Sequence, residues 1–583
     1  MKTPAESLGG GCLTLRDPNI GELEMAVALA PGAATSPGEW RGIPRSVLIT
    51  AVVFALVGLL VQGWRLEALR ASYDQGIFLQ VFWNGLRGHF FESTLSSQLS
   101  TNVIHAGQLP AVGYHRLGQH FTPALLLWLP VVAIFGPWGL PLVQVGLMTL
   151  AGLVLHRLAR TSLSDPRLAA FLAFSFFAAN AVLGPTWGNF TDLCQLPVVF
   201  FLLMLGLQQR RHWLVMTMAL LMPLIREDTG VLLVGIALWL GIRHPHRWRL
   251  AAAMGLYGAG WVVVVTSVLM PLFSEDNSRR FMVENFGHFI DGQDRASSLE
   301  VLSNLLKRPW NLLVELVDPP GETIRYLLAQ SLPLLFLPLL SLDVWLLIGL
   351  PLAGLLLAQG KPSPLSINVR YALLVVPGLF AGAVLWWKSH GELFQRRRLR
   401  AFWIGAMALS LLFTLSGNPN RSLSFLIPDS VDPWIYSSPA SQWQHGRAAR
   451  RLLRSIPSHD SVAATTPLVP LLAQREALVR FPRSTAYLDR EGNRREVNWI
   501  AMDVAYLQTH GKVSNGDREE LNRIAELLPG LLAHYGIAGI DDGIVLLQRG
   551  SANRPGSCGQ LVTLMEQSGG RNGGDADWTA CRG

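Results

Sequence analysis

Asp74 is the first residue whose type and surroundings indicate chemistry. It stands in the run SYDQGIF (72–78), directly after a long apolar segment. A carboxylate at a membrane surface can take a proton from a substrate hydroxyl, which is the role of a general base. The alternative is structural, because Asp is favoured at the N-cap of a helix and an amphipathic stretch follows it. The sequence by itself leaves both roles open.

His120 is the second candidate and lies in the run GQHFTP (118–123). Histidine titrates near neutral pH, so it can bind a phosphate or carry a proton between groups. A lone histidine at an interface is more often structural. We therefore treat His120 as a candidate substrate-binding residue and not as a catalytic one.

Arg226, Glu227 and Asp228 form a charged triplet between two short apolar segments. Ionisable residues at membrane depth are costly, and they usually line a cavity or a permeation path. If the two segments cross the membrane fully, the triplet is a hydrated tip. If the segments are bent, the charges point into a polar cavity, which is the interpretation that their short length favours.

Lys361, Arg370 and Tyr371 precede a later apolar segment on the side of the membrane that is otherwise poor in cations. A cation in that position can hold a phosphate through charge-assisted hydrogen bonds. The alternative is an interfacial anchor, a role that Arg and Tyr often fill at the ends of membrane helices.

The composition places these residues in a membrane protein. Half of the 583 residues are hydrophobic and 15% are charged, against about 25% charged in an ordinary globular chain. The net charge of +8 could suggest a nucleic-acid partner. We exclude that class because the Lys and Arg residues are scattered in small groups between apolar segments.

Apolar segments near the length that crosses a bilayer recur along the chain. We expect eleven spans, of which the fifth and sixth are the shortest and together could form a bent hairpin that does not cross fully. The predicted spans are 46–65, 139–157, 168–187, 194–209, 213–225, 229–242, 250–272, 325–341, 343–358, 370–388 and 400–416.

The distribution of Arg and Lys predicts the orientation. With a cytoplasmic N-terminus, every strong basic group falls on the cytoplasmic side, as the positive-inside rule requires. The soluble C-terminal residues then face the periplasm or the cell exterior. The basic groups are Arg41/Arg45, Arg157/Arg160/Arg167, Arg210/Arg211, Arg243/Arg247/Arg249 and Lys388/Arg396/Arg397/Arg398/Arg400.

Two long external loops are expected, at 66–138 and 273–324. The first contains 123–136, which is too short and too rich in proline to span, so we expect an interfacial or re-entrant segment. It also contains the amphipathic stretch 76–86, which we expect to lie along the membrane surface. The second loop mixes charged and apolar positions and should form surface helices.

Four regions follow from this pattern: a disordered cytoplasmic tail (1–45), a membrane domain (46–416), an external α/β domain (417–550) and a flexible Gly-rich tail (551–583). Within the α/β domain we expect helices near 440–455 and 517–535. Strands are expected at 461–466, 477–481 and 498–504 and on both sides of the turn at 541–543. Cys558 and Cys581 would then be outside the cell and able to pair as a disulfide.

Several of these runs together resemble a known family. YDQGIFLQVFWN (73–84), LGQHFTPALLLWLPVVAIFG (117–136), IREDTG (225–230), INVRYALLVVP (367–377) and VAATTPLVPLLAQRE (462–476) resemble domain-of-unknown-function family 2079, a bacterial family of predicted membrane proteins. Arg370 departs from the His expected there. The family in turn resembles the GT-C class of membrane glycosyltransferases, which use polyprenyl-phosphate sugars and carry an acidic residue early in the first external loop, where Asp74 stands.

The resemblance implies a mainly α polytopic bundle and a glycosyl transfer enzyme of the inner (cytoplasmic) membrane. Asp74 would be the base, and Arg226, Arg370 or Lys361 would hold the leaving phosphate. Glu227 and Asp228 would bind sugar hydroxyls or a divalent cation. The alternatives are a transporter or lipid flippase without chemistry, and a structural membrane protein whose external domain binds the envelope. The expected partners are the lipid bilayer and a polyprenyl-phosphate-linked sugar.

Overall fold

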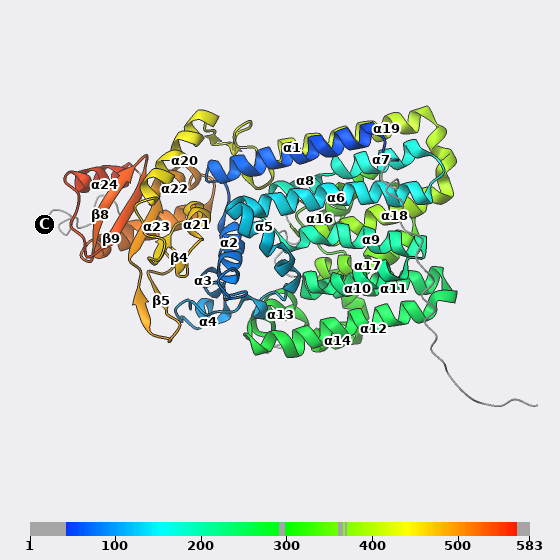
Figure 1. Cartoon of the computed structure of the whole chain (residues 1–583), viewed down its shortest axis with the longest axis horizontal. Coiled ribbons are helices and arrows are strands. Elements are labelled where there is room, and N and C mark those ends of the chain that lie inside the picture. Colours follow the sequence, from blue (N-terminus) through cyan, green and yellow to red (C-terminus); the bar gives the residue numbers. More distant parts are fainter. Residues whose placement is uncertain (1–41, 291–297, 359–364, 368–369, 568–583) are drawn as a thin grey trace, which may run out of the picture. The chain divides into compact units, whose positions relative to one another are not determined.

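The computed structural model describes residues 42–290, 298–358, 365–367 and 370–567. The predicted cytoplasmic tail therefore lies almost wholly outside the described residues, as does Lys361. From Pro44 onward the chain forms one compact unit. In this unit a bundle of apolar helices is followed along the chain by a small α/β domain (Figure 1).

Six helical segments in the described part of the chain are long and apolar enough to cross a membrane. Their apolar sequences carry few charges, and a helix of 20 residues is about as long as a hydrocarbon core is thick. The predicted polytopic helical bundle is confirmed. The main helices of these segments are α1 (Arg45–Glu67), α6 (Gly139–Ser162), α9 (Leu196–Gln209), α12 (Trp248–Val264), α18 (Val376–His390) and α19 (Arg397–Ser416).

A seventh span is bent. Helices α7 (Pro166–Phe177) and α8 (Asn180–Trp187) meet at an angle of 44°. The backbone groups released at the bend are satisfied by Ser410 of α19, which donates to the carbonyl of Ala178 and accepts from the amide of Asn180. Broken helices persist at membrane depth where a neighbouring helix supplies such partners.

Three further predicted spans fall on shorter helices: α10 (His212–Ile225), α11 (Gly230–Arg243) and α17 (Leu342–Leu357). Helices α10 and α11 are about 21 Å long at 1.5 Å per residue, less than a hydrocarbon core of about 30 Å. The short 3₁₀ turn η5 (Glu227–Thr229) joins them. Gly230 lets α11 approach α12 closely, because a Cβ there would lie 2.7 Å from the carbonyl oxygen of Gly258.

The prediction of a continuous helix over 325–341 is wrong. Helix α16 (Pro320–Ser331) ends there, and two 3₁₀ turns follow, η11 (Leu332–Leu334) and η12 (Leu337–Leu340). Leu335 and Phe336 between them have positive φ angles of 60° and 61°. Pro333 and Pro338 cannot donate the amide hydrogen bonds that a continuous helix requires.

The first external loop is more buried than expected. Helix α2 (Tyr73–Gly85) replaces the predicted surface helix, and it is buried on almost every side. A Cβ at Gly76 would lie 2.4 Å from a methyl group of Val469 in α21 (Val469–Leu472), so the two helices are in direct contact. Protein therefore covers a stretch that was expected to be an exposed amphipathic helix, and its position along the membrane surface stays a prediction. The loop continues through α3 (Thr94–Ser97), α4 (Thr101–Ile104), η1 (Arg116–Gly118), η2 (Pro123–Trp128), α5 (Leu129–Phe135) and η3 (Gly136–Trp138).

Residues 123–138 do not continue straight into α6. Gly136 has a φ of 55°, which turns the chain after α5. A Cβ at Gly139 would lie 2.7 Å from the Cα of Val132, so α5 folds back onto the start of α6. A seven-residue helix is too short to span, in agreement with the prediction of a re-entrant or interfacial segment.

The second external loop forms short helices, as predicted. Most of its residues are less buried than those of the bundle. Its described elements are η9 (Asn277–Phe281), α13 (Met282–Phe286), η10 (Gly287–Phe289), α14 (Ser298–Lys307) and α15 (Pro309–Glu315).

The C-terminal domain contains a five-stranded sheet in the order β4-β3-β7-β9-β8. The pairs β4–β3 and β3–β7 are parallel, and β7–β9 and β9–β8 are antiparallel. Strand and helix positions agree with the predicted pattern. The elements are α20 (Pro439–Leu453), β3 (Val462–Ala464), η16 (Thr466–Leu468), β4 (Leu478–Arg480), β7 (Trp499–Asp503), α22 (Val504–His510), α23 (Asn515–Leu531), β8 (Tyr535–Asp541) and β9 (Ile544–Arg549).

Small hairpins and one helix of this domain were not anticipated. Helix α24 (Ser557–Glu566) lies in the predicted flexible tail, where Leu561 and Met565 join the core of the domain. That part of the tail prediction is wrong. Cys558 is disulfide-bonded, and its predicted partner Cys581 lies outside the described residues. The hairpins are β1 (Ser430–Val431) with β2 (Trp434–Ile435) and β5 (Ala486–Leu488) with β6 (Arg494–Glu496).

The first external loop covers the edge strand β4. Thr94 Oγ1 donates to the carbonyl of Leu478 at 2.9 Å and accepts from its amide at 3.1 Å. Gln80 Nε2 donates to the carbonyl of Arg475 at 3.1 Å. Such contacts satisfy backbone groups that an open sheet edge would expose. Through Gln80 they also hold α2, the helix that carries Asp74, against the C-terminal domain.

Candidate functional site

Asp74 pairs with Arg370, although 296 positions separate them in the chain. Arg370 Nη1 donates to Asp74 Oδ2 at 2.7 Å. The side chains are 39% exposed for Asp74 and 31% for Arg370, so solvent and substrate can reach the pair. Ser72, and not Asp74, occupies the N-cap position of α2. The capping role considered for Asp74 is therefore wrong.

Tyr371 connects this pair to the charged triplet. Arg370 and Tyr371 begin the 3₁₀ segment η13 (Arg370–Leu374) that leads into α18. The guanidinium of Arg370 lies 5.3 Å from the Tyr371 ring centroid, and that of Arg226 lies 5.6 Å from it. Cation–π contacts of this kind hold two arginines close together, although their charges repel.

Arg226 follows α10 and is 3% exposed. Its guanidinium makes a two-point contact with Asp228, with Nε donating to Oδ1 at 2.8 Å and Nη2 to Oδ2. Paired hydrogen bonds of this type are among the stronger contacts that a protein makes. A chain of contacts thus runs from Asp74 through Arg370, Tyr371 and Arg226 to Asp228.

Glu227 points toward the first external loop. Its carboxylate accepts hydrogen bonds from His120 Nδ1 and from the amide of Phe121, both at 2.9 Å. Burial raises the pKa of Glu227, but His120 and Arg226 outweigh that effect and hold the pKa below its usual range. Glu227 is therefore a carboxylate at neutral pH, and it anchors His120.

Arg116 and Asp192 belong to the same group of charges, and the sequence analysis did not single them out. Asp192 starts the turn η4 (Asp192–Gln195) and is 2% exposed. Its carboxylate lies 4.0 Å from Arg116 Nη2, and Arg226, His120 and Arg370 also act on it electrostatically. An acidic residue at the start of an apolar segment was the available signal.

The structure thus brings together all the predicted site residues that it describes. Asp74, Arg370 and Asp228 form a partly exposed outer layer, and Arg116, Asp192 and Arg226 form a buried inner layer. That these groups line a common cavity remains a prediction, as does the role of Lys361. The outer carboxylate can accept a proton, and the arginines can hold an anion.

The predicted divalent cation at Glu227 and Asp228 gains no support from this geometry. Each carboxylate is already engaged by a basic side chain, His120 for Glu227 and Arg226 for Asp228. Among the described residues no group of three or more His, Cys, Asp or Glu side chains is arranged to hold a metal ion.

Comparisons with known proteins give a family and distantly similar solved structures. A family described as predicted membrane proteins (DUF2079) matches residues 65–546. A crystal structure of ArnT from Cupriavidus metallidurans bound to undecaprenyl phosphate is 13% identical, with a TM-score of 0.45, over 89% of this chain and 100% of that one. Among curated proteins, none matches the sequence.

Proposed function

The chain belongs to the DUF2079 family of predicted membrane proteins, and we propose that it is a membrane glycosyltransferase. In this proposal it moves a sugar from a polyprenyl-phosphate donor to a hydroxyl of an envelope acceptor. The reaction takes place at the outer face of the cytoplasmic membrane. The observation that carries the proposal is the accessible Asp74–Arg370 pair, with a second arginine across the Tyr371 ring.

The pair suits a transfer that releases a phosphate. As the acceptor oxygen bonds to the anomeric carbon, the bond from that carbon to the phosphate oxygen breaks. The acceptor proton passes to the Asp74 carboxylate, and the polyprenyl phosphate leaves with the electron pair. Arg370, supported by Arg226, neutralises the charge that develops on the leaving oxygen.

Donor binding and release of the base are coupled in this arrangement. Arg370 donates to Asp74 at 2.7 Å. A donor phosphate can compete for the same guanidinium, which frees the Asp74 carboxylate to meet the acceptor hydroxyl. Glu227, His120 and Asp228 would bind the sugar hydroxyls while keeping the contacts between Glu227 and His120 and between Asp228 and Arg226.

The proposal also fixes an orientation. The N-terminus is cytoplasmic, and Asp74 and the C-terminal domain face the periplasm or cell exterior, as the distribution of arginine favours. A reporter that is active only outside the cytoplasm should therefore be active when fused after Gly550. Activity of a cytoplasm-only reporter at that position would overturn the orientation.

The experiment that tests the function is mass spectrometry of envelope glycans and polyprenyl lipids from a deletion strain. Wild-type protein should restore a sugar modification that the deletion removes, and Asp74→Asn should not, although it is inserted at the wild-type level. General-base residues typically contribute about 10²–10⁴-fold to rate. The matched control is Glu519→Gln, an exposed carboxylate of the C-terminal domain, which should restore the modification fully.

Three outcomes contradict the proposal. Full restoration by Asp74→Asn would exclude Asp74 as the base. Loss of the modification in the deletion strain, with the lipid-linked sugar retained on the cytoplasmic side, would favour the transporter or flippase. An unchanged profile of both glycans and lipids would favour a structural membrane protein.

A further inference from the structure

A second group of arginines lies outside the proposed transfer site. It lines a cavity of about 240 Å³ between the end of α1, the loop after it, and the C-terminal domain. At about 30 Å³ for each water, that volume holds roughly eight water molecules, enough for a phosphate group with a small substituent. The charged residues that line the cavity are Arg65, Arg70 and Arg421, and no Asp or Glu of the described residues lines it.

Arg65 is a buried charge without a carboxylate partner among the described residues. It is 1% exposed. Its guanidinium donates to the carbonyls of Trp187 at 2.9 Å and Arg70 at 3.1 Å, and to Asn189 Oδ1 at 3.0 Å. Neutral acceptors do not cancel a positive charge, and an uncompensated buried charge is costly.

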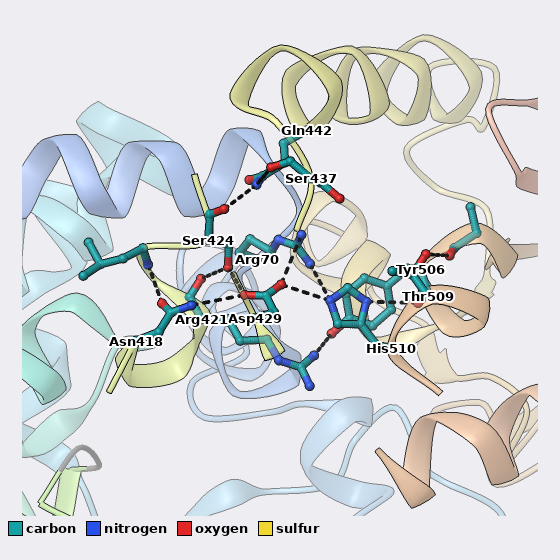
Figure 2. A network of polar contacts seen from close by, with 12 residues as sticks. Arg70, Asn418, Arg421, Ser424, Asp429, Ser437, Gln442, Tyr506, Thr509 and His510 are labelled. Atoms are coloured by element: carbon teal, nitrogen blue, oxygen red, sulfur yellow. Dashed lines mark hydrogen bonds and ion pairs between the residues drawn. The ribbon is translucent and has the colours of Figure 1, made fainter. Parts of the chain in front are cut away.

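Arg70 is only partly neutralised. Its Nη2 lies 3.5 Å from Asp429 Oδ2, and the same carboxylate oxygen is 3.1 Å from His510 Nε2. Figure 2 shows Arg70, His510 and Ser424 converging on Asp429. One carboxylate therefore serves several donors, and it leaves a positive excess at the cavity.

Arg421 is the most accessible of the three. It belongs to η15 (Pro419–Arg421), with a side chain that is 33% exposed. Its Nη1 donates to Tyr506 Oη at 2.7 Å, and the nearest carboxylate oxygen, on Asp517, is 4.0 Å away. Its charge is thus only weakly compensated by the carboxylate of Asp517.

Three residues that line this cavity also carry unsatisfied polar atoms. Arg65 Nε, Arg70 Nε and Thr466 Oγ1 are buried and have no hydrogen-bond partner in the part of the chain that the structure describes. A ligand in the cavity could supply acceptors that these atoms lack. All three are donors, and Thr466 can also accept.

We infer that this cavity is a binding site for a phosphate group, held by Arg65, Arg70 and Arg421 with Thr466. An oxyanion supplies both the negative charge and the acceptor oxygens that these donors lack. The ligand is a free phosphate or phosphomonoester, or the phosphate of a lipid headgroup. Because Arg65 belongs to α1 and Thr466 to the C-terminal domain, the bound phosphate joins the two.

The site does not depend on the proposed transfer reaction, so the test is binding. The unfolding midpoint of the full chain in detergent is measured as inorganic phosphate replaces chloride at constant ionic strength. A saturable rise is expected, since a ligand that binds only the folded state stabilises it. Repeating the measurement in lipid discs with and without phosphatidylglycerol shows whether a lipid phosphate fills the site instead.

Single substitutions test whether the phosphate binds in this cavity. Arg70→Gln and Arg421→Gln should weaken phosphate binding about tenfold or more, because each loses a charge-assisted contact. Thr466→Val has nearly the same shape and loses only an unpaired hydroxyl, so it should keep the wild-type fold and still bind phosphate more weakly. The matched control is Arg451→Gln, whose side chain is 73% exposed, and its binding should equal that of the wild type.

The inference is overturned if neither inorganic phosphate nor phosphatidylglycerol raises the midpoint of the wild-type protein. It is also overturned if Arg451→Gln lowers binding as much as Arg421→Gln does, because the effect would then be one of net charge. A third result would also overturn it: phosphate binding that is lost in Asp74→Asn and unchanged in Arg70→Gln. The phosphate would then bind at the transfer site and not in this cavity.

Discussion

The charges around Tyr371 and those around Arg65 use the same residue type in opposite ways. Around Tyr371, Arg370, Arg226 and Arg116 each face a carboxylate, on Asp74, Asp228 and Asp192. At the cavity, the described partners of Arg65 are all neutral acceptors, and Arg70 shares one carboxylate with a histidine. A balanced set of charges keeps its geometry without a ligand, whereas an unbalanced set needs an anion.

The largest expected loss of stability comes from a substitution in the buried part of the charges around Tyr371. Arg226→Ala removes the partner of the partly exposed Asp228 and one of the two arginines that neutralise the buried Asp192. Breaking a buried ion pair typically costs about 3–5 kcal/mol. We expect a correspondingly large fall in the unfolding midpoint of the purified protein.

Arg494→Ala is the control for that measurement. Arg494 pairs with Glu496 on an exposed hairpin with a side chain that is 70% exposed. Exposed pairs contribute about 0–1 kcal/mol. Similar midpoints for Arg226→Ala and Arg494→Ala would show that the set around Tyr371 is not a rigid unit.

A charge cluster in the C-terminal domain gives a second effect, and this one depends on pH. His445 lies between Asp503, at 3.0 Å, and Asp542, at 2.8 Å. Burial alone would lower the pKa of His445, but the two carboxylates raise it to about 9 from 6.5. The charged histidine therefore stabilises the fold fully below pH 6.5, and this stabilisation is lost as the pH rises through about 9.

The measurement is the unfolding free energy of the wild type and of His445→Gln between pH 6 and about 10. The wild type should lose stability with a slope of at most about 1.4 kcal/mol per pH unit. The contribution of His445 should be absent from the variant. Identical pH profiles would show that folding does not raise the pKa of His445.

A smaller effect is expected for the accessible pair of the transfer site. Asp74→Asn removes an ion pair in which both side chains are about a third exposed. Pairs at that exposure contribute up to about 1 kcal/mol, so stability should change little while the proposed activity is lost. A loss of stability like that of Arg226→Ala would instead make Asp74 a structural residue.

The smallest effect is expected at the cavity itself. Thr466→Val removes a hydroxyl that has no partner among the described residues. Without phosphate, its stability should lie within about 0.5 kcal/mol of the wild type. A clearly larger loss of stability would mean that the hydroxyl has a structural partner. The cavity would then not differ from the charges around Tyr371 in keeping unpaired groups for a ligand.

Local pattern was sufficient for much of the secondary structure. The apolar runs predicted α1, α6, α9 and α19, and the alternating run and Asp-Gly turn of the C-terminal domain predicted β7, β8 and β9. Helix α24 was missed because a Gly-rich, polar context hid two core residues, Leu561 and Met565. The interruption of the predicted helix at Leu335 and Phe336 was missed. An apolar composition does not reveal that two residues adopt positive φ angles.

The sequence by itself determined that this is a polytopic membrane protein with a small α/β domain, because hydropathy and charge act locally along the chain. It also marked Asp74, His120, Glu227, Asp228 and Arg370 as unusual. Only the tertiary structure decided that Arg370 pairs with Asp74 across 296 positions and that Asp192 and Arg116 join them. It also decided that Arg65 meets no carboxylate within the described residues. Those relations depend on how separate helices pack, and the packing distances are not encoded in the spacing of residues along any one helix.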